Sequence, residues 1–312
     1  MAKQLRMLVV GLGTQGTKRK ASAGPDFVAA VDPANPEAQY RMIEEIPTDS
    51  YDGAFVCTPD DQKPDILEFL ALQGKHILCE KPLLFSTLQD LKDFERLCTK
   101  QSIFFQTAYN HRFEPSFVEM KRVIELNLLG KIYSISLFYG NGTARDVQNS
   151  LWRDRDDGVI SDLGSHLMDT VLFWFPELSI EYSLNSVASF ESQSPDYARI
   201  ESKDSSPLVS LEMTTCMWKN TFRCDVIGEL GSAHIMGLCK WGPCTFALRE
   251  RVFPSGKPIE TILEYPQGDP TWNLEYENFR DRLRSKPTME LGRDRYILTQ
   301  LQRIRQVSRV HR

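Results

Sequence analysis

The first third of the chain alternates short apolar runs with stretches in which apolar residues recur at helical spacing. The apolar runs are Leu5–Val10, Phe27–Val31, Ala54–Cys57, His76–Cys79 and Ile103–Gln106. Between them, residues 64–73 and 87–100 carry apolar stripes of the kind that a helix buries. Continuous apolar strands that alternate with helices predict a parallel sheet covered on both faces.

In the second half of the chain, apolar and polar positions alternate one by one. The alternating runs are residues 209–213, 222–226 and 259–265. This period of two predicts strands buried on one face only, in an antiparallel or mixed open sheet. Helical stretches interrupt these strands at residues 115–127, 158–175, 273–285 and 292–307.

The two patterns predict two domains, for which a chain of 312 residues is long enough. We expect an α/β domain over residues 1–110. We expect an α+β domain with a large open, mostly antiparallel sheet over residues 111–312. The last helix is a candidate to pack back on the first domain.

Composition excludes several classes of protein. The net charge of -5 argues against a nucleic-acid binder that depends on a global positive field. No run approaches the roughly 18 apolar residues of a membrane span, and the N-terminal apolar segment is too short for a signal peptide. The 7 cysteines form no C-x-x-C pair, which predicts reduced thiols and no metal site. We therefore expect a cytoplasmic protein with no membrane or nucleic-acid partner.

A glycine motif follows the first apolar run. Gly11, Gly13 and Gly16 form G-x-G-x-x-G directly after a candidate strand. In a dinucleotide site the first glycine permits the tight turn, the second lets the backbone approach a pyrophosphate, and the third lets helix and strand pack closely. A plain glycine turn is the structural alternative. The motif predicts a Rossmann domain in which Leu12, Thr14 and Gln15 also line the cofactor.

Asp32 ends the second apolar run and strengthens this prediction. A carboxylate there can accept hydrogen bonds from an adenosine ribose and would repel a 2′-phosphate, which favours NAD over NADP. Lys18, Arg19 and Lys20 could instead bind that phosphate, so NADP stays the alternative cofactor, although we interpret these residues as a solvated helix face. A methyltransferase can also combine a glycine loop with an acidic residue at a strand end.

The most specific feature is the stretch from Gly74 to Leu84, in which an apolar run ends in Glu80-Lys81-Pro82. Ligands of open α/β sheets bind outside the carboxyl ends of strands, where Lys81 is expected to lie. Pro82 restricts the backbone of Lys81 to extended geometry and so orients its side chain. An ammonium in this position could hydrogen-bond a substrate oxygen; an exposed lysine without a role is the alternative.

These motifs together resemble the glucose–fructose oxidoreductase / inositol dehydrogenase / rhizopine-catabolism (GFO/IDH/MocA) oxidoreductase family. The resemblance runs from residue 8 to about residue 236. Besides the glycine motif and residues 74–82, it rests on Cys57-Thr58-Pro59, Asn110-His111-Arg112-Phe113, Leu129-Gly130-Lys131-Ile132, Asp162-Leu163-Gly164-Ser165-His166-Leu167-Met168-Asp169, Val226-Ile227-Gly228 and Gly231-Ser232.

The resemblance implies a nicotinamide-binding Rossmann domain and a second domain whose sheet carries the substrate and an oligomer interface, in a homodimer or homotetramer. It implies that Lys81, Asp162 and His166 are catalytic. The cofactor would also contact Cys57, Thr58, Pro59, Glu80, Lys81 and Asn110. The substrate would contact Lys81, Asp162, His166, Arg112, Trp152 and Arg153, the last three of which have ordinary packing as their alternative.

The residues around His166 agree with a catalytic role. Asp162, His166 and Asp169 are spaced so that they share one face of a helix. A histidine near a carboxylate can exchange protons close to neutral pH. A hydrogen-bonded pair without function is the alternative, and metal binding is a weaker one. The sequence departs from the family pattern at Asp60-Asp61-Gln62-Lys63, where a histidine is usual, and at Asp156-Asp157-Gly158-Val159, where more glycines are usual.

We therefore expect hydride transfer between a nicotinamide and a secondary alcohol or ketone of a sugar, polyol or nucleotide sugar. His166 would remove the hydroxyl proton and Lys81 would hydrogen-bond the same oxygen. Asp162 would orient His166 or a neighbouring hydroxyl. Two rivals use the same fold: a non-catalytic NAD-binding sensor, and a glycosidase-like relative that oxidises its substrate only transiently.

Overall fold

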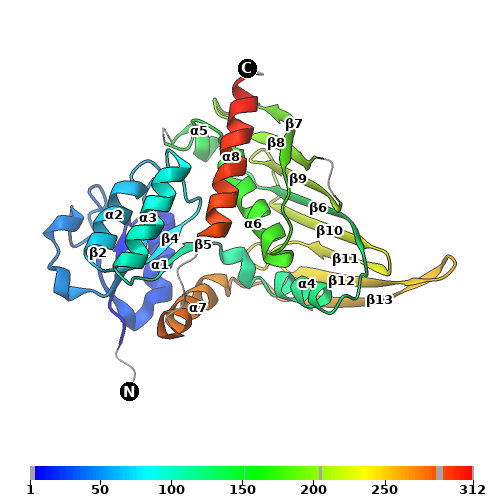
Figure 1. The fold of residues 1–312 in the computed structure, drawn as a ribbon, viewed down its shortest axis with the longest axis horizontal. Coiled ribbons are helices and arrows are strands. Elements are labelled where there is room, and N and C mark those ends of the chain that lie inside the picture. The colour runs from blue at the N-terminus through cyan, green and yellow to red at the C-terminus, as the bar shows by residue number, and fades with distance from the viewer. Residues whose placement is uncertain (1–3, 151, 204–205, 286–290, 311–312) are drawn as a thin grey trace. The chain divides into compact units, whose positions relative to one another are not determined.

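The computed structural model describes residues 4–150, 152–203, 206–285 and 291–310 (Figure 1). The chain divides into two compact units. The first unit comprises Met1–Asn110 and Thr271–Leu298, and the second comprises His111–Pro270 and Thr299–Arg312. The segment Thr271–Leu298, which the sequence analysis assigned to the second domain, thus groups with the first unit.

The first unit contains a five-stranded sheet in the order β2-β1-β3-β4-β5, with every pair of neighbouring strands parallel. Its strands are β1 (Met7–Val10), β2 (Phe27–Val31), β3 (Gly53–Val56), β4 (His76–Glu80) and β5 (Phe105–Ala108). Its helices are α1 (Thr14–Ala23), α2 (Lys63–Leu72), α3 (Leu88–Lys100), α7 (Thr271–Ser285) and the first residues of α8 (Gly292–Val310), with short 3-10 turns at Gly24–Asp26, Ile43–Glu45 and Thr48–Ser50.

Both faces of this sheet are covered. Strands β1, β3 and β5 are buried along their whole length. Leu8 and Val10 of β1 belong to one hydrophobic cluster, and Met7 and Val9 belong to another. Because successive side chains of a strand point to opposite faces, two cores follow from one apolar run. The predicted parallel, doubly covered sheet is confirmed.

The second unit is built on an eight-stranded sheet in the order β13-β12-β11-β10-β6-β9-β8-β7. Its neighbours pair antiparallel except β6 and β9, which are parallel. The strands are β6 (Ile132–Gly140), β7 (Tyr182–Ala188), β8 (Tyr197–Ser202), β9 (Leu208–Thr214), β10 (Thr221–Gly228), β11 (Gly231–Met236), β12 (Cys244–Val252) and β13 (Gly256–Tyr265). The prediction of a large, mostly antiparallel sheet is confirmed.

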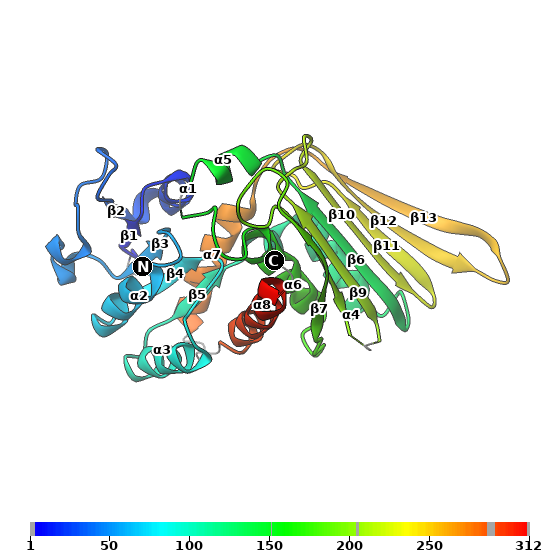
Figure 2. The same ribbon diagram turned by 90° about the horizontal axis from the view of Figure 1, so that it is seen from above.

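Helices cover one face of the second sheet (Figure 2). They are α4 (Pro115–Glu125), α6 (Ser165–Trp174) and the second part of α8, whereas α5 (Ala144–Gln148) is a short helix after β6. A 3-10 turn at Asn110–Phe113 precedes α4, and a π-helical turn at Ile160–Gly164 leads into α6. In β10 the buried residues Phe222, Cys224 and Val226 alternate with less buried ones, as predicted.

Strand β13 corrects one prediction. The alternation over residues 259–265 predicted a strand buried on one face, but β13 is exposed along almost its whole length. Ile259 and Ile262 have exposed fractions of 61% and 54%. Within the part of the chain that the structure describes, this strand is the edge of the sheet and pairs with β12 alone. The alternation therefore indicated a strand here but not a core to cover it.

Among the helices that the structure describes, none is both long enough and apolar enough to cross a membrane.

Candidate functional site

The glycine motif forms the turn between β1 and α1, and each glycine has a separate steric reason. Gly11 has a φ of +88°, and a Cβ on it would lie 2.8 Å from the backbone of Cys57. A Cβ on Gly16 would lie 1.9 Å from the carbonyl oxygen of Gly11. A Cβ on Gly13, by contrast, would meet no atom within 4 Å. The backbone at Gly13 therefore faces open space, as the approach of a pyrophosphate requires.

Two further features, one at the start of α1 and one after β3, fit the binding of a dinucleotide. Helix α1 begins after Gly13 without a side-chain cap and with no acidic residue in its first turn. Its first N–H groups are thus suited to hydrogen-bond an anion. The hydroxyl of Thr58, at the end of β3, is buried without a hydrogen-bond partner among the described residues. Open space, N–H groups and a buried hydroxyl together match the needs of a bound dinucleotide.

Asp32 ends β2, next to the glycine turn. Its Oδ2 accepts the N–H of Leu12 at 2.8 Å, and its Oδ1 accepts those of Ala34 and Asn35 at 2.9 and 2.8 Å. Partial burial by itself would raise the pKa of this carboxyl, but the three N–H donors lower it below its usual value. Asp32 is therefore an ionised acceptor at neutral pH, and it also ties the glycine turn to β2.

The carboxyl ends of β1, β3 and β4 form one edge of the first sheet, because these neighbouring strands are parallel. The glycine turn, the segment Cys57-Thr58-Pro59 and the segment Glu80-Lys81-Pro82 all leave the sheet at this edge. Asn110 follows the end of β5, and its amide donates to the hydroxyl of Thr271 at 2.7 Å. The predicted cofactor residues of the first unit thus share one sheet edge.

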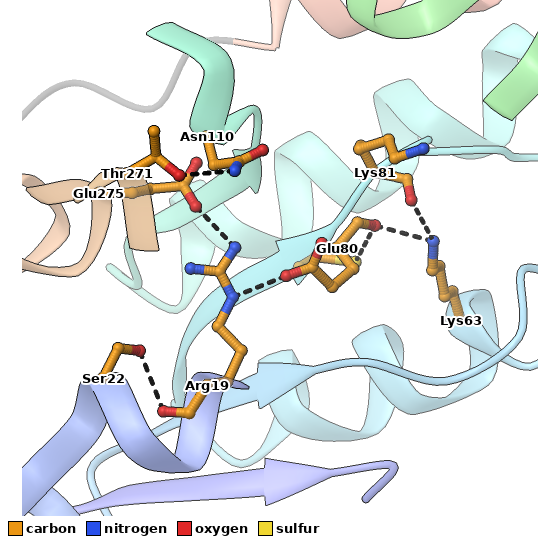
Figure 3. A network of polar contacts seen from close by, with 9 residues as sticks. Arg19, Ser22, Lys63, Glu80, Lys81, Asn110, Thr271 and Glu275 are labelled. Atoms are coloured by element: carbon orange, nitrogen blue, oxygen red, sulfur yellow. Dashed lines mark hydrogen bonds and ion pairs between the residues drawn. The ribbon is translucent and has the colours of Figure 1, made fainter. Parts of the chain in front are cut away.

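A buried ion cluster lies beside this edge (Figure 3). Arg19 of α1 is 1% exposed. It donates to Glu80 from Nε and to Glu275 of α7 from Nη2, each at 2.6 Å, and lies over the ring of Trp272. Although burial by itself would lower its pKa, Glu80 and Glu275 raise the pKa of Arg19 above its ordinary value. The interpretation of residues 18–20 as a solvated helix face is therefore wrong for Arg19.

A second buried cation, Lys63, lies beside the turn formed by Glu80-Lys81-Pro82. The Lys63 ammonium donates to the carboxylate of Asp60 and to the carbonyl oxygen of Glu80, both at 2.7 Å. It also contacts the carbonyl oxygens of Lys81 at 3.3 Å and Pro82 at 3.0 Å. The sequence analysis noted that the segment Asp60-Asp61-Gln62-Lys63 lacks the histidine that is usual in this segment, but it assigned Lys63 no role.

In the second unit, two imidazole rings lie face to face. His166, in the first turn of α6, stacks on His111 with ring centroids 4.1 Å apart and an angle of 17° between the planes. The two residues are 7% and 2% exposed. The π-helical turn that contains Asp162 directly precedes α6, and such turns are frequent at functional sites. His111 was quoted in the motif but was not predicted as a site residue.

The acidic residues around His166 pair with arginines. Asp162 accepts from Arg153 at 3.3 Å, and the two side chains are 35% and 28% exposed. Asp169 is bound by Arg112 through both Nε, at 2.8 Å, and Nη2. This two-pronged ion pair favours packing over substrate contact as the role of Arg112. Trp152 is 44% exposed.

Lys240, which follows β11, completes the cluster and was missed from the sequence. Its ammonium lies 3.2 Å from Nε2 of His111 and donates to the hydroxyl of Tyr139 at 3.1 Å. It also lies over the ring of Trp241. Burial lowers the pKa of Lys240, more than the nearby carboxylates Glu114, Asp269 and Asp162 raise it. A lysine in a loop carries no motif, so the sequence had no signal for it.

Glu114 lies behind this cluster at the start of α4 and is 0% exposed. Its Oε2 accepts the N–H of Cys239 at 3.2 Å, while Oε1 has no hydrogen-bond partner among the described residues. Burial raises the pKa of Glu114, against the lowering effects of Cys239 and Lys240. The second unit therefore gathers an acid, an ammonium and two imidazoles, a set able to accept and hand on protons near neutral pH.

Of the three predicted catalytic residues, Lys81 belongs to the first unit, and Asp162 and His166 belong to the second. Within the second unit, Asp162 lies in the π-helical turn and His166 lies in the first turn of α6, which follows it.

Two family models match the chain. The model of the "Oxidoreductase family, NAD-binding Rossmann fold" matches residues 5–109, and the GFO/IDH/MocA C-terminal domain matches residues 117–234. Among curated proteins, the glucose-6-phosphate 3-dehydrogenase of Bacillus subtilis (strain 168) is 30% identical over 142 residues, covering 44% of this chain and 40% of that protein. The chain spans less than half the length of this relative and of others like it.

Solved structures share the fold over the whole chain. A putative NADPH-dependent oxidoreductase from Desulfitobacterium hafniense aligns with a TM-score of 0.85 at 15% identity, covering 100% of this chain and 97% of that one. An inositol dehydrogenase homolog from Azotobacter vinelandii, complexed with NADH and myo-inositol, aligns with a TM-score of 0.79 at 17% identity, covering 99% and 97%. Because the models of one family match both halves in order, the chain belongs to the GFO/IDH/MocA oxidoreductase family, whose first domain is an NAD-binding Rossmann fold.

Proposed function

We propose that this protein is an NAD-dependent oxidoreductase. It transfers a hydride between the nicotinamide and a secondary alcohol or ketone of a sugar, polyol or nucleotide sugar. The observation that carries the proposal lies within the first unit, where the open glycine turn and the lysine of Glu80-Lys81-Pro82 leave the same edge of one parallel sheet. Such an edge is where ligands of open α/β sheets bind.

In the proposed reaction, NAD supplies the hydride acceptor. The ammonium of Lys81 hydrogen-bonds the substrate oxygen and stabilises the charge that develops on it. The imidazole of His166 takes the proton of the hydroxyl oxygen while the hydride leaves the carbon that bears this oxygen, so the alcohol loses one proton and one hydride as it becomes a ketone. The ion pair of Asp162 with Arg153 borders His166 and contributes to substrate binding, as does Trp152.

The substrate class follows the names of the relatives. Curated proteins that match this chain include a glucose-6-phosphate 3-dehydrogenase, an inositol 2-dehydrogenase and a levoglucosan dehydrogenase. All three names describe oxidation of a carbohydrate or polyol hydroxyl. Asp32, an ionised acceptor with no phosphate-binding character, supports NAD as the cofactor in place of NADP.

The test is turnover of NAD with a panel of glucose 6-phosphate, myo-inositol and levoglucosan, followed by NADH absorbance. Lys81→Ala and His166→Ala should each lower kcat by about 10²- to 10⁴-fold, as expected for loss of a proton-transfer group. NAD affinity, measured by calorimetry, should stay near that of the wild type. The exposed Lys100→Ala on α3 is the matched control and should keep full turnover.

Three outcomes would contradict the proposal. Near-normal turnover in both variants would remove Lys81 and His166 from the reaction. Tight NAD binding without turnover of any substrate would support a sensor. Release of a leaving group from a glycoside without net NADH would support the glycosidase-like alternative.

We further propose that the protein acts in the cytoplasm as a homodimer or homotetramer that associates through the eight-stranded sheet. The face of this sheet that the helices leave uncovered carries exposed apolar side chains, among them Met236 and Ile262, which are 50% and 54% exposed. Patches of this kind favour association between subunits. Analytical ultracentrifugation gives the number of chains, and a monomer at all concentrations would exclude the proposed assembly.

A further inference from the structure

We propose that Lys63 is a positioning residue for Lys81: its ammonium acts as an internal cation that gathers three successive carbonyl groups of the Glu80-Lys81-Pro82 turn and thereby directs the Lys81 side chain. The inference rests on the proposed function in one respect, namely that Lys81 acts in the reaction. The contacts that carry it lie entirely within the first unit.

The first argument is the direction of the carbonyl groups. In an extended strand successive carbonyls point to opposite sides, yet those of residues 80, 81 and 82 all lie within 3.3 Å of one ammonium nitrogen. Three carbonyl dipoles that converge on one point repel each other unless a positive charge lies between them. The Lys63 ammonium lies at this point. Besides the three carbonyl oxygens it contacts the carboxylate of Asp60, 2.7 Å away.

The second argument is that this cation is buried and stays charged. Lys63 is 1% exposed. Burial by itself lowers its pKa, but the neighbouring Asp60 and the hydrogen bond to it contribute to a net rise above the ordinary value. The ammonium is therefore a permanent part of the turn across the neutral range, much as a bound metal cation would be.

The third argument connects the turn to the reactive group. Figure 3 shows the carbonyl group of Lys81 directed toward Lys63 while its side chain extends in the other direction. Both groups leave the same residue, so holding the carbonyl also limits where the ammonium can lie. On one side Arg19 holds the Glu80 carboxylate at 2.6 Å. On the other side Pro82 restricts the backbone of Lys81. Lys63 supplies the third constraint, from beneath.

The direct test observes the Lys81 side chain without any substrate. Lysines of the NAD-loaded protein are reductively dimethylated with ¹³C-formaldehyde and dimethylamine–borane as the reductant, and the Lys81 signal in the carbon NMR spectrum is assigned by its absence in Lys81→Ala. In Lys63→Met, which keeps the length of the side chain but removes the charge, the Lys81 signal should shift and broaden. An unchanged Lys81 signal would overturn the inference, whatever the enzyme does.

Lys75→Met is the matched control. Lys75 belongs to the same unit, and its ammonium also binds two backbone carbonyls, those of Thr48 and Tyr51. The loss of these two hydrogen bonds should lower thermal stability, but it should leave the Lys81 signal and kcat unchanged. If Lys75→Met moves the Lys81 signal as much as Lys63→Met does, the effect is general loosening and the inference fails.

Kinetics then separate this inference from the proposed function. Lys63→Met should lower kcat by about 10- to 100-fold, as small misplacements of a reacting group do, while NAD affinity should stay near that of the wild type. In a Lys81→Ala background, Lys63→Met should cause no further loss, because its effect passes through Lys81. Full additivity of the two losses would overturn the positioning role.

Chemical rescue gives the last readout. Added ammonium or methylammonium ions should restore part of the turnover of Lys63→Ala, whereas tetramethylammonium, which donates no hydrogen bond, should not. If Lys81→Ala itself keeps full turnover, the proposed function fails, while the NMR comparison still decides whether Lys63 orients Lys81. A Lys81 signal that shifts in Lys63→Met, together with full turnover of Lys81→Ala, would thus support the positioning of Lys81 by Lys63 and contradict the proposed function.

Discussion

The two units treat their buried positive charges in opposite ways. In the first unit, Arg19 and Lys63 face carboxylates and carbonyl oxygens, and the pKa of each is raised. In the second unit, Lys240 faces an imidazole and a phenol, and burial lowers its pKa. The difference teaches that carboxylates and carbonyl oxygens compensate the buried cations of the first unit, whereas the buried cation of the second unit is compensated only in part.

The physical reason lies in what surrounds each charge. A buried cation costs several kcal/mol unless anionic partners or hydrogen-bond acceptors compensate the loss of water. Two carboxylates compensate Arg19 at 2.6 Å each. Lys240 has a nearby imidazole nitrogen and hydroxyl, and its carboxylates act through longer-range attraction, so part of that cost remains and burial lowers its pKa.

The largest expected effect is on stability in the first unit. Arg19→Met leaves the buried carboxylate of Glu275 and the largely buried one of Glu80 without their cation and should lower the free energy of unfolding by about 3–5 kcal/mol. Urea denaturation measures this loss. The control Arg96→Met removes one partner of an exposed ion pair on α3 and should cost no more than about 1 kcal/mol. Equal losses in both variants would contradict the role of burial.

A second prediction concerns protonation in the second unit. Lys240→Met removes a positive charge beside His111, on which His166 stacks, while Glu114, Asp162 and Asp269 remain. Because a cation disfavours the imidazolium, its removal should move the acidic limb of the kcat/KM profile upward by about 1 pH unit.

The exposed Lys219→Met, in the loop before β10, is the control for Lys240 and should leave the profile in place. The comparison between the units would be broken by a Lys240→Met enzyme whose pH profile matches that of the wild type. It would also be broken by an equal shift in Lys63→Met, since the fixed charges of the first unit are predicted to act on geometry and not on this titration.

The smallest expected effect is a gain in stability. Burial raises the pKa of Glu114 in the folded protein, so the folded state binds this proton more tightly than the unfolded state. Stability is therefore lost as pH rises from the ordinary carboxyl pKa through the raised one. Glu114→Gln keeps an acceptor for the N–H of Cys239 but cannot ionise. Above the raised pKa, where the wild type must keep an ionised Glu114 buried, this variant should need more free energy to unfold than the wild type.

At acidic pH, where Glu114 is protonated in both states, the same variant should show no gain in thermal unfolding. A gain of the same size at all pH values would mean that packing and not ionisation causes it. The matched Glu119→Gln, on the same helix in an ion pair with Arg122, should lose a little stability instead.

The framework of the first unit was predictable because its strands need only continuous apolar residues. The predicted strand Phe27–Val31 has the same bounds as β2. The helix predicted over residues 64–73 is α2, which begins one residue earlier, at Lys63. Helix α1 gave no apolar stripe, since its close packing depends on Gly16 and its buried side is completed by Arg19. Strand β13 shows the opposite case, in which alternation indicated a strand that no core covers.

The site was predictable only where residues belong to a motif. The glycine turn, Lys81, Asp162 and His166 stand in short recognisable segments. Arg19 could not be assigned, because its acceptors lie 61 and 256 positions away in the sequence. Lys240 lies 129 positions from His111. Pairings over such distances depend on how the chain folds, and single-residue patterns carry no information about them.

The division of the first unit into two separate chain segments has a consequence for biogenesis. Residues 1–110 leave the ribosome before all of residues 111–270, and only then does Thr271–Leu298 arrive. Until that moment the newly made Arg19 lacks Glu275, and the ring of Phe55 lacks Tyr276, which lies 5.1 Å away in the finished protein. The nascent cofactor-binding unit must therefore keep an incomplete interior until residues 271–298 have been made, so that truncation before this segment damages the part of the protein made first.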